Sequence, residues 1–237
     1  MRMESECIAD FEPVLSCKGV FKSFDDGSGN RISILEDVDL DVAPGDLISI
    51  CGKSGSGKST LLHIISSLLK PDSGCVLLDG KDVYAMRDKE IMRLRRNALG
   101  FVFQDNMLLE DITVEENIIL PAQIAGVLTP DVRARIADLA KKMGIDGIMA
   151  RRAGLISSGE KSRVSLLRAI SVGKRIIFLD EPTGALDSEN ARAVEELIIS
   201  LAGSLGMAFV YVTHDDAFAK RAGKRFAISE KRLIRRG

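Results

Sequence analysis

Short, largely apolar runs recur along this chain, and each stops at polar residues. The run Leu47–Cys51 precedes a glycine-rich stretch, residues 176–179 precede Asp180, and residues 208–212 lie just before His214. Runs of this length without polar alternation are typical of strands that are covered on both faces, as in parallel sheets. The pattern therefore predicts an α/β fold with a mostly parallel core sheet.

The first part of the chain follows a different pattern. We predict strands over residues 14–24 and 32–42, joined by a turn at residues 25–30. The second strand alternates apolar and acidic positions, as a half-buried strand does. The apolar positions are Ile34, Val38, Leu40 and Val42, and the acidic ones are Glu36, Asp37, Asp39 and Asp41. A small antiparallel sheet laid against the parallel one is expected here.

Helical periodicity dominates the middle of the chain. Residues 113–143 follow it, with Pro130 as a second helix start. We interpret residues from about 105 to 172 as a helical subdomain inserted into a single domain, which spans residues 14–237 after an N-terminal extension of residues 1–13. Further helices are expected over residues 88–97, 157–172 and 189–201, and further strands over residues 73–78 and 99–103.

The stretch from Gly52 to Ser59 matches the phosphate-binding loop pattern G-x-x-x-x-G-K-[ST], between a predicted strand and a predicted helix start. Triphosphate oxygens need several backbone N–H groups at the positive end of a helix dipole. Gly55 and Gly57 let the backbone turn tightly around the phosphates, because a Cβ would block the approach. Lys58 has the charge and reach for the β- and γ-phosphates, and the Ser59 hydroxyl suits Mg²⁺.

Two carboxylates follow the apolar run at residues 176–179. Ligands of open α/β sheets bind at the carboxyl ends of the strands, so Asp180 is placed to hold Mg²⁺ through water. Glu181 is placed to polarise a water for attack on the γ-phosphate. After a phosphate-binding loop, this pair predicts a nucleoside triphosphate hydrolase.

Composition argues against several classes of protein. The net charge of −1 gives no general electrostatic argument for nucleic acid, and tryptophan is absent. The four cysteines, Cys7, Cys17, Cys51 and Cys75, have no metal-ligand spacing and indicate a reducing compartment. No apolar run approaches the roughly 20 residues of a membrane span. The acidic N-terminus lacks the features of a secretory signal. We expect a cytoplasmic protein with no nucleic-acid partner.

The order of the motifs resembles that of ATP-binding-cassette (ABC) ATPases, from about Leu15 to the C-terminus. It runs through the phosphate-binding loop, Gln104 after a strand, Ser157-Ser158-Gly159-Glu160, Leu179-Asp180-Glu181-Pro182, Ala185-Leu186-Asp187 and Thr213-His214-Asp215. Details such as Phe101-Val102-Phe103-Gln104 and residues 113–117 are similar to the subfamily that works with lipoprotein-releasing, macrolide-efflux and cell-division-type permeases. The resemblance implies ATP and Mg²⁺ as cofactors and ATP hydrolysis as the reaction.

The resemblance also implies roles for single residues. Phe24 matches the aromatic residue that stacks on adenine, Gln104 the one that contacts Mg²⁺ and the attacking water, and His214 the switch histidine at the γ-phosphate. The implied ATP-binding set is Phe24, Gly52, Lys53, Ser54, Gly55, Ser56, Gly57, Lys58, Ser59 and Thr60, and the implied Mg²⁺ ligands are Ser59, Gln104 and Asp180. Lys53 contributes backbone only, and His63 is given no functional role.

The signature motif, Ser157-Ser158-Gly159-Glu160, acts in trans in this family, on the γ-phosphate held by the other subunit. Two copies are therefore expected to close head to tail on ATP, with Asp187 aligning the shared surface. Ser158 departs from the usual Gly and Ile156 from the usual Leu, so we expect an active but slower site. The resemblance implies that this opening and closing drives a separate integral membrane permease, which holds the chain at the inner face of the membrane. The permease is expected to dock near Gln104 and the helices of residues 113–143.

Three alternatives follow from the same sequence. A regulatory ATPase of a cell-division or cell-wall complex would have the same ATP site but move no solute. An ABC ATPase of translation or DNA repair is disfavoured, because the chain has one phosphate-binding loop and no sustained heptads. A GTPase is disfavoured further by the absence of an Asn-Lys-x-Asp motif. An exporter of a lipid, lipoprotein, peptide or drug-like molecule is the function that we predict.

Overall fold

The computed structural model describes residues 13–236, and a six-stranded sheet lies at the centre of this part of the chain, in the order β10-β9-β3-β8-β7-β6. Every neighbouring pair is parallel except β9 with β10. The strands are β3 (Leu47–Cys51), β6 (Leu99–Val102), β7 (Ile176–Asp180), β8 (Ala208–Thr213), β9 (Lys224–Ser229) and β10 (Arg232–Arg236). The predicted mostly parallel core sheet is confirmed.

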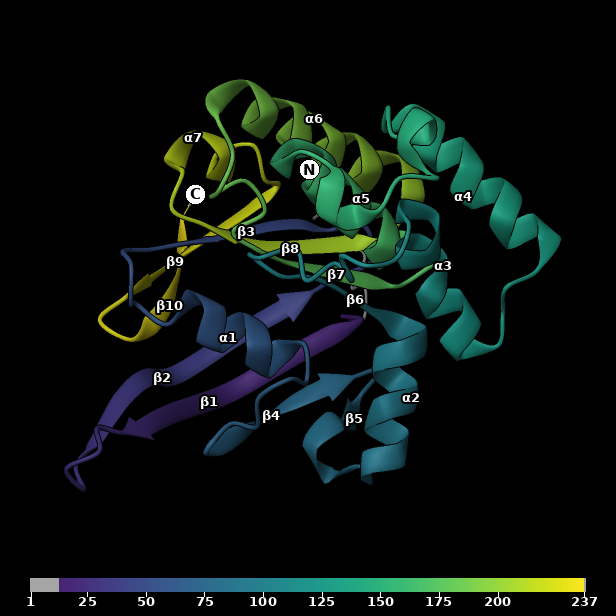
Figure 1. Ribbon diagram of the computed structural model, residues 1–237. Helices are drawn as coiled ribbons and strands as arrows, with labels where there is room; N and C mark the ends of the chain where they lie inside the picture. The colour runs from purple at the N-terminus through teal and green to yellow at the C-terminus, as the bar shows by residue number, and fades with distance from the viewer. Residues whose placement is uncertain (1–12, 237) are drawn as a thin grey trace, which may run out of the picture.

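A second, antiparallel sheet has the order β2-β1-β4-β5. Its strands are β1 (Leu15–Asp25), β2 (Arg31–Val42), β4 (Ser73–Leu78) and β5 (Lys81–Asp82). Its position against the central sheet is visible in Figure 1, where β1, β2 and β4 lie below β3, β8 and β7 with α1 between the two sheets. The predicted N-terminal antiparallel sheet is therefore also confirmed.

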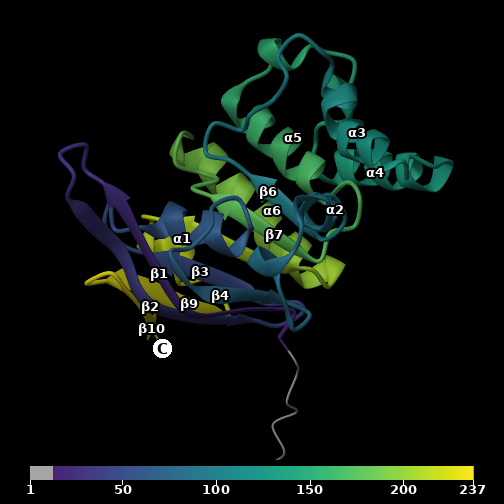
Figure 2. The ribbon, with the colours of Figure 1, turned by 90° about the horizontal axis from the view of Figure 1, so that it is seen from below.

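The helices cover both faces of the central sheet. They are α1 (Lys58–Ile65), α2 (Asp88–Ala98), α3 (Val114–Ala125), α4 (Pro130–Lys142), α5 (Ser158–Ile170), α6 (Ser188–Leu205) and α7 (Asp216–Ala219), with short 3₁₀ turns at Val83–Ala85, Asp146–Ile148 and Ala153–Leu155. In Figure 1, α5, α6 and α7 lie above the sheet and α1 lies below it. Figure 2 shows α3, α4 and α5 grouped to one side of the strands. The predicted extension, residues 1–13, lies outside the described residues except for Pro13.

The strands β7 and β8 separate two hydrophobic cores. Ile177 and Leu179 of β7 point into a cluster with the helices α3 to α6, whereas Ile176 and Phe178 point into a cluster with α1 and the antiparallel sheet. Successive side chains of a strand face opposite sides, so a strand buried on both sides must be apolar at every position. This explains why these strands are uninterrupted apolar runs in the sequence.

The predicted alternation of β2 is wrong in its first half. Leu35 is fully buried, while Ile34, which the alternation assigns to the buried face, is only half-buried. Asp37 has a left-handed backbone, φ 54°, and the pairing of β1 with β2 shifts register nearby. An extra residue in a strand moves all following side chains to the other face. The phase predicted from Val38, Leu40 and Val42 therefore does not extend back to Ile34.

Candidate functional site

The carboxyl ends of the parallel strands bring distant motifs together. Cys51 at the end of β3 pairs with Thr213 at the end of β8, and Asp180 at the end of β7 pairs with Val212. The segments that follow these strands therefore leave the sheet at the same edge. These segments carry the phosphate-binding loop, Glu181 and His214, which lie about 30 to 160 positions apart in the sequence.

The phosphate-binding loop owes its shape to two glycines for different reasons. Gly55 has φ 75° with open space around a Cβ, so only its left-handed backbone favours glycine. Gly57 has φ 99°, and a Cβ there would lie 2.8 Å from Cγ2 of Ile34. At Gly57 a Cβ would therefore collide with β2, in addition to the expected obstruction of the phosphates. Any larger residue at Gly57 would push the loop away from the sheet.

Helix α1 begins at Lys58 with an open N-terminus. Its N-cap is Gly57, no side chain of the described residues caps it, and its first turn holds no acidic residue. The side chain of Lys58 is 5% exposed, and its ammonium donates hydrogen bonds to the carbonyl oxygens of Gly52 and Lys53, each at 3.0 Å. Free N–H groups and a buried cation at a helix start favour an anion.

Asp180 is almost completely buried at the end of β7. Burial raises the pKa of its carboxyl, and the Ser59 hydroxyl opposes this shift by donating a hydrogen bond of 2.8 Å to Oδ1. The hydroxyl and the carboxylate are the hard oxygen donors that Mg²⁺ prefers. They come from α1 and β7, so the fold itself joins the loop to the carboxylate.

Glu181 is held by two neighbouring side chains. Its Oε2 lies 2.7 Å from Nδ1 of His214, and its Oε1 lies 4.0 Å from the ammonium of Lys58. The backbone of Glu181 is left-handed, φ 46°, an uncommon conformation for a residue with a side chain. These contacts direct the carboxylate to the end of the phosphate-binding loop.

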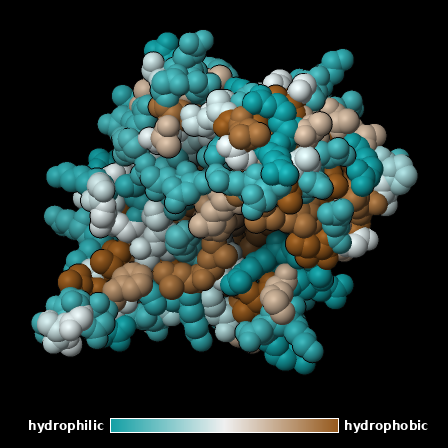
Figure 3. Space-filling view, viewed as in Figure 1, coloured by the Kyte–Doolittle hydropathy of each residue, from teal (hydrophilic) through white to brown (hydrophobic). Residues whose placement is uncertain are grey.

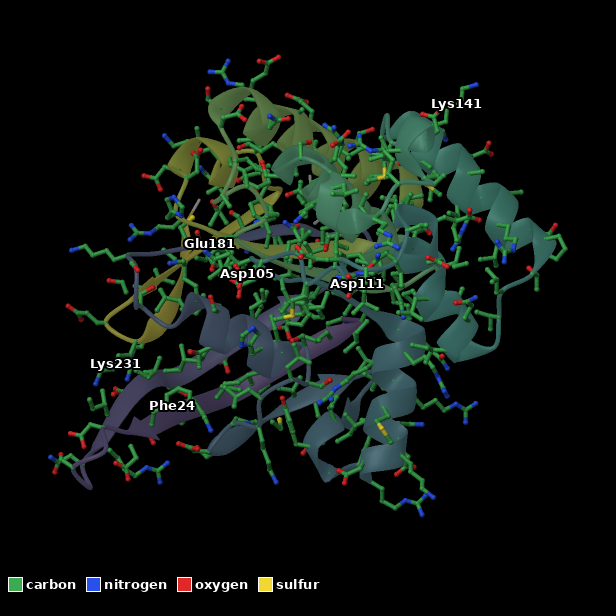
Figure 4. All side chains as sticks on the ribbon, viewed as in Figure 1. Phe24, Asp105, Asp111, Lys141, Glu181 and Lys231 are labelled. Carbon is green, nitrogen blue, oxygen red and sulfur yellow. The ribbon has the colours of Figure 1, made fainter. Side chains whose placement is uncertain are left out.

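A cavity of about 550 Å³ joins these groups. Its lining consists of Phe24, Ile34, Ser54, Gly55, Gly57, Lys58, Ser59, Thr60, Gln104, Glu181 and His214. Figure 4 labels Phe24 on β1 and Glu181 after β7, and α1 lies between them in that view. A nucleotide has both a ring and phosphates, and this cavity offers the aromatic ring of Phe24 together with the Lys58 ammonium and the N–H donors at the start of α1.

The remaining loop residues border a second cavity. Gly52, Lys53 and Ser56 line a neighbouring cavity of about 940 Å³ beside β9, which Ser54 and His214 also border. Ile34 lines the nucleotide-sized cavity, although the strand pattern predicts only a core position for it. The shift in strand phase at Asp37 releases Ile34 toward the loop, and no sequence pattern predicts such a bulge.

The signature residues lie apart from this cavity. In the described chain, Ser157, Ser158, Gly159 and Glu160 do not border it, and they form the start of α5 instead. Oε2 of Glu160 accepts hydrogen bonds from the backbone N–H of Ser157 at 2.7 Å and from its hydroxyl at 2.8 Å. These bonds lower the pKa of the Glu160 carboxyl. Ser158 is exposed, so its side chain meets no obstacle within the chain.

Asp187 is linked to the same region through α6. It caps α6 by accepting hydrogen bonds from the N–H groups of Glu189 and Asn190, and the Asn190 amide donates to its Oδ2 at 2.6 Å. A Cβ on Gly159 would lie 2.5 Å from the amide oxygen of Asn190. Gly159 is therefore required for the packing of α5 against α6.

Residues 13–236 contain neither a membrane-spanning helix nor a cluster of metal-binding side chains. No helix in this range is long and apolar enough to cross a bilayer. The same range contains no group of three or more His, Cys, Asp or Glu side chains arranged to hold a metal ion. A metal at Ser59 and Asp180 would thus share its ligands with a substrate, as Mg²⁺ commonly does with phosphates.

Comparisons with known proteins agree with this geometry. The family profile described as ABC transporter matches residues 35–184. The lipoprotein-releasing system ATP-binding protein LolD of Bacteroides fragilis is 39% identical over 221 residues, which cover 93% of this chain and 100% of LolD. The macrolide export ATP-binding/permease protein MacB of Nitrosomonas europaea is 38% identical over 225 residues, which cover 95% of this chain but only 34% of MacB.

Solved structures of an ABC transporter cassette also match this chain over most of its length. The dimeric ABC transporter cassette MJ0796 has a TM-score of 0.84 at 32% identity, covering 94% of this chain and 99% of that one. The same cassette in a dimeric post-hydrolysis state, bound to ADP and Pi, has a TM-score of 0.83. The predicted fold and the predicted hydrolase activity are confirmed. The chain belongs to the ABC transporter family, as an ATP-binding subunit that hydrolyses ATP.

Proposed function

We propose that two copies of this chain clamp ATP head to tail and thereby drive a separate membrane permease. One observation carries this proposal. A single copy gathers the phosphate-binding loop, Glu181 and His214 around one cavity, while Ser157 and the start of α5 border no part of it. A second copy can supply the missing donors if the two associate in opposite directions.

Within one copy, binding rests on the open start of α1. The N–H groups from Gly52 to Thr60 and the Lys58 ammonium neutralise the phosphates, and Phe24 stacks on the adenine. Lys22 supports the ring of Phe24, because its ammonium lies 5.4 Å from the ring centroid. Binding at this half requires no second copy.

Ser59, Gln104 and Asp180 are the residues that would hold Mg²⁺. The hydroxyl of Ser59 already touches the Asp180 carboxylate, and Gln104 borders the same cavity. When bound, the ion would neutralise charge on the β- and γ-phosphate oxygens. The oxygen donors of this set match the preference of Mg²⁺ over softer metals.

Glu181 and His214 act in the hydrolysis step itself. Glu181 orients a water and accepts its proton, while the water oxygen bonds to the γ-phosphorus and the bond to the β-phosphate oxygen breaks. His214 holds Glu181 through its 2.7 Å contact and donates to the γ-phosphate from its other ring nitrogen. Lys58, 4.0 Å from Glu181, balances the charge of both carboxylate and phosphate.

Complementation in a mixture tests the head-to-tail arrangement. Lys58→Ala removes the loop function of a copy, and Ser157→Arg removes the donors that this copy offers to its partner. Each variant alone should be inactive. Mixed dimers contain one site built from the intact loop of one variant and the intact signature of the other, so mixing should restore phosphate release. A mixture as inactive as its components would refute the arrangement.

The permease site that we propose is a groove between α2, β6 and α3. A cavity of about 380 Å³ lies there, lined by Met92, Leu99, Gly100, Phe101, Leu120, Pro121, Ile124 and Ala169, with Arg95, Arg96, Arg168 and Lys174 around it. Met92 is 59% and Ile124 63% exposed. Figure 3 shows a hydrophobic area over α3 and toward α2. Apolar walls with cations around them fit a short cytoplasmic helix that has apolar and acidic side chains.

Substitution in the groove tests this docking site. Met92→Asp and Ile124→Asp place a charge on the apolar wall and touch no residue of the ATP site. We expect the tagged variants to lose an integral membrane protein that co-purifies with the unmodified chain from detergent extracts. Phosphate release by the purified variants should stay unchanged. Retention of the membrane protein by both variants would place the docking surface elsewhere.

We propose export of a lipid, lipoprotein, peptide or drug-like molecule, from the cytoplasmic face of the membrane. The support is the similarity to proteins named for lipoprotein release and macrolide export. Reconstitution of the chain with its co-purified membrane protein in vesicles would test the cargo class directly. Transport by the chain alone would contradict the need for a permease.

A further inference from the structure

His63 lies on α1, one turn beyond the residues that meet the phosphates, and faces Asp180. Its side chain is 34% exposed, yet its Nε2 atom is buried. Among the described residues, Nε2 has no hydrogen-bond partner, and Oδ2 of Asp180 lies 3.6 Å from it. A buried polar atom without a partner is uncommon and calls for a physical reason.

An aromatic neighbour restricts the orientation of the imidazole. The ring of Phe101 lies 5.6 Å from that of His63, with an angle of 42° between the planes. Phe101 is itself packed against Phe103 at 4.3 Å and Phe178 at 6.4 Å. The ring of His63 is therefore held between β6 and the end of β7, with its Nε2 edge turned inward.

The two oxygens of Asp180 have different surroundings. Oδ1 accepts a hydrogen bond from the Ser59 hydroxyl at 2.8 Å, and Oδ2 faces Nε2 of His63. A neutral imidazole with its proton on Nε2 donates to Oδ2 after a shift of about half an ångström, since N–H···O bonds span roughly 2.7–3.2 Å. Two donors from the same helix would then fix the plane of the carboxylate.

We propose that His63 is a positioning residue that orients the Asp180 carboxylate for the metal–nucleotide complex. The inference rests on the Mg²⁺ site proposed above and adds His63 as a residue that contacts a metal ligand rather than the metal itself. Groups that orient metal-binding carboxylates and histidines commonly change metal affinity when they are removed. His63 does not touch ATP, so its effect should appear in the metal dependence of binding rather than in nucleotide recognition.

Two matched substitutions separate hydrogen bonding from packing. His63→Phe keeps a ring against Phe101 but has no donor, and His63→Gln places an amide donor at a reach similar to that of Nε2. The probe is Mn²⁺, titrated into the protein with a non-hydrolysable ATP analogue, with free Mn²⁺ measured by electron paramagnetic resonance. We expect His63→Phe to weaken Mn²⁺ binding about tenfold and His63→Gln to restore most of it.

Binding of a fluorescent ATP analogue in EDTA provides the second measurement. It should be unchanged in both variants, because metal-free nucleotide depends on the loop and Phe24. An equal loss with and without metal would show that His63 only packs the helix and would overturn the inference. Failure of His63→Gln to restore Mn²⁺ binding would overturn it as well. If His63→Phe fails to fold, His63→Leu takes its place.

Asp180→Asn distinguishes failure of this inference from failure of the proposed site. Weak Mn²⁺ binding in Asp180→Asn together with normal binding in His63→Phe would overturn the role of His63 and leave the Mg²⁺ site standing. Normal Mn²⁺ binding in Asp180→Asn would remove the proposed site, and the role of His63 with it.

Discussion

Helices α1 and α5 both point an N-terminus toward an expected phosphate, but they differ in how that N-terminus is satisfied. The start of α1 has a glycine N-cap, no capping side chain in the described structure and no acidic residue in its first turn. The start of α5 is closed by a capping box in which Glu160 occupies the N–H and hydroxyl of Ser157. An open helix start can bind an anion directly, whereas a closed one must first release its own carboxylate.

The difference suggests an order of events. ATP can bind to α1 of a single copy, and α5 of the second copy engages later, when the γ-phosphate competes with Glu160 for Ser157. Changes near α1 should therefore alter binding or chemistry in each copy. Changes near α5 should alter only the association of two copies around ATP and the hydrolysis that depends on this association.

The largest expected effect is at Glu181. Glu181→Gln keeps the shape of the side chain but cannot accept a proton, so hydrolysis should fall about 10²–10⁴-fold. ATP binding should persist, and gel filtration should show a stable ATP-dependent dimer. Asp216→Asn, a change of an acidic residue outside the nucleotide-sized cavity, serves as the control. Unchanged turnover in Glu181→Gln would remove Glu181 from its role.

Ser157→Ala should have the next largest effect. It removes one hydroxyl donor to a charged group, so the rate of ATP hydrolysis should fall roughly 10–100-fold. The affinity of a fluorescent ATP analogue for single copies, measured at protein concentrations too low for dimers, should not change. Ser158→Ala, which leaves Ser157 intact, is the matched control. Equal loss of monomer binding in Ser157→Ala would contradict the division between the two helices.

Phe24→Ala should weaken nucleotide binding about tenfold, because stacking of a base on an aromatic ring contributes roughly 1–3 kcal/mol. Phe24→Tyr preserves a ring and should bind like the unmodified chain. The measurement is a titration with a fluorescent ATP analogue, and the turnover at saturating ATP should be close to normal. A large loss of turnover at saturation would mean that Phe24 affects more than the adenine.

The smallest effect is expected at Glu160. Glu160→Gln keeps the cap but removes a negative charge beside the incoming phosphate, so dimers should form at ATP concentrations about threefold to tenfold lower. Its hydrogen bonds to Ser157 hold the pKa of the Glu160 carboxyl below the ordinary value. The carboxylate thus stays ionised at neutral and mildly acidic pH, and the advantage of the variant should not vary there. Light scattering at several pH values would measure it.

Several features of the fold could be predicted from residue patterns alone. The strands β3, β7 and β8 are buried on both sides, and burial on both sides favours a largely apolar sequence, with Ser49 of β3 donating a hydrogen bond to the carbonyl oxygen of Ala219. Motif spacing then placed Asp180 and Glu181 at the end of a strand, where the structure has them next to Ser59 and His214. Such positions can be predicted from the sequence because burial and motif spacing restrict their residue types.

Other features depend on contacts that no local pattern encodes. The strands β9 and β10 are short and charged, KRFAIS and RLIRR, and they form at the edge of the sheet because β3 offers a free side there. Ile34 reaches the cavity only through the bulge at Asp37. His63 faces Asp180 because α1, which follows β3, packs across β8 and β7 on one face of the central sheet. Each of these needs the three-dimensional arrangement before it can be stated.

The left-handed backbone of Glu181 has a consequence for evolution and engineering. A residue with a Cβ at φ 46° costs of order 1–2 kcal/mol relative to glycine, which adopts this conformation freely. If Glu181 has the role proposed above, a glycine at this position would relieve this backbone cost and would also abolish hydrolysis. Screens that select only for heat resistance should therefore enrich inactive sequences at residue 181, the point where stability and turnover are in direct conflict.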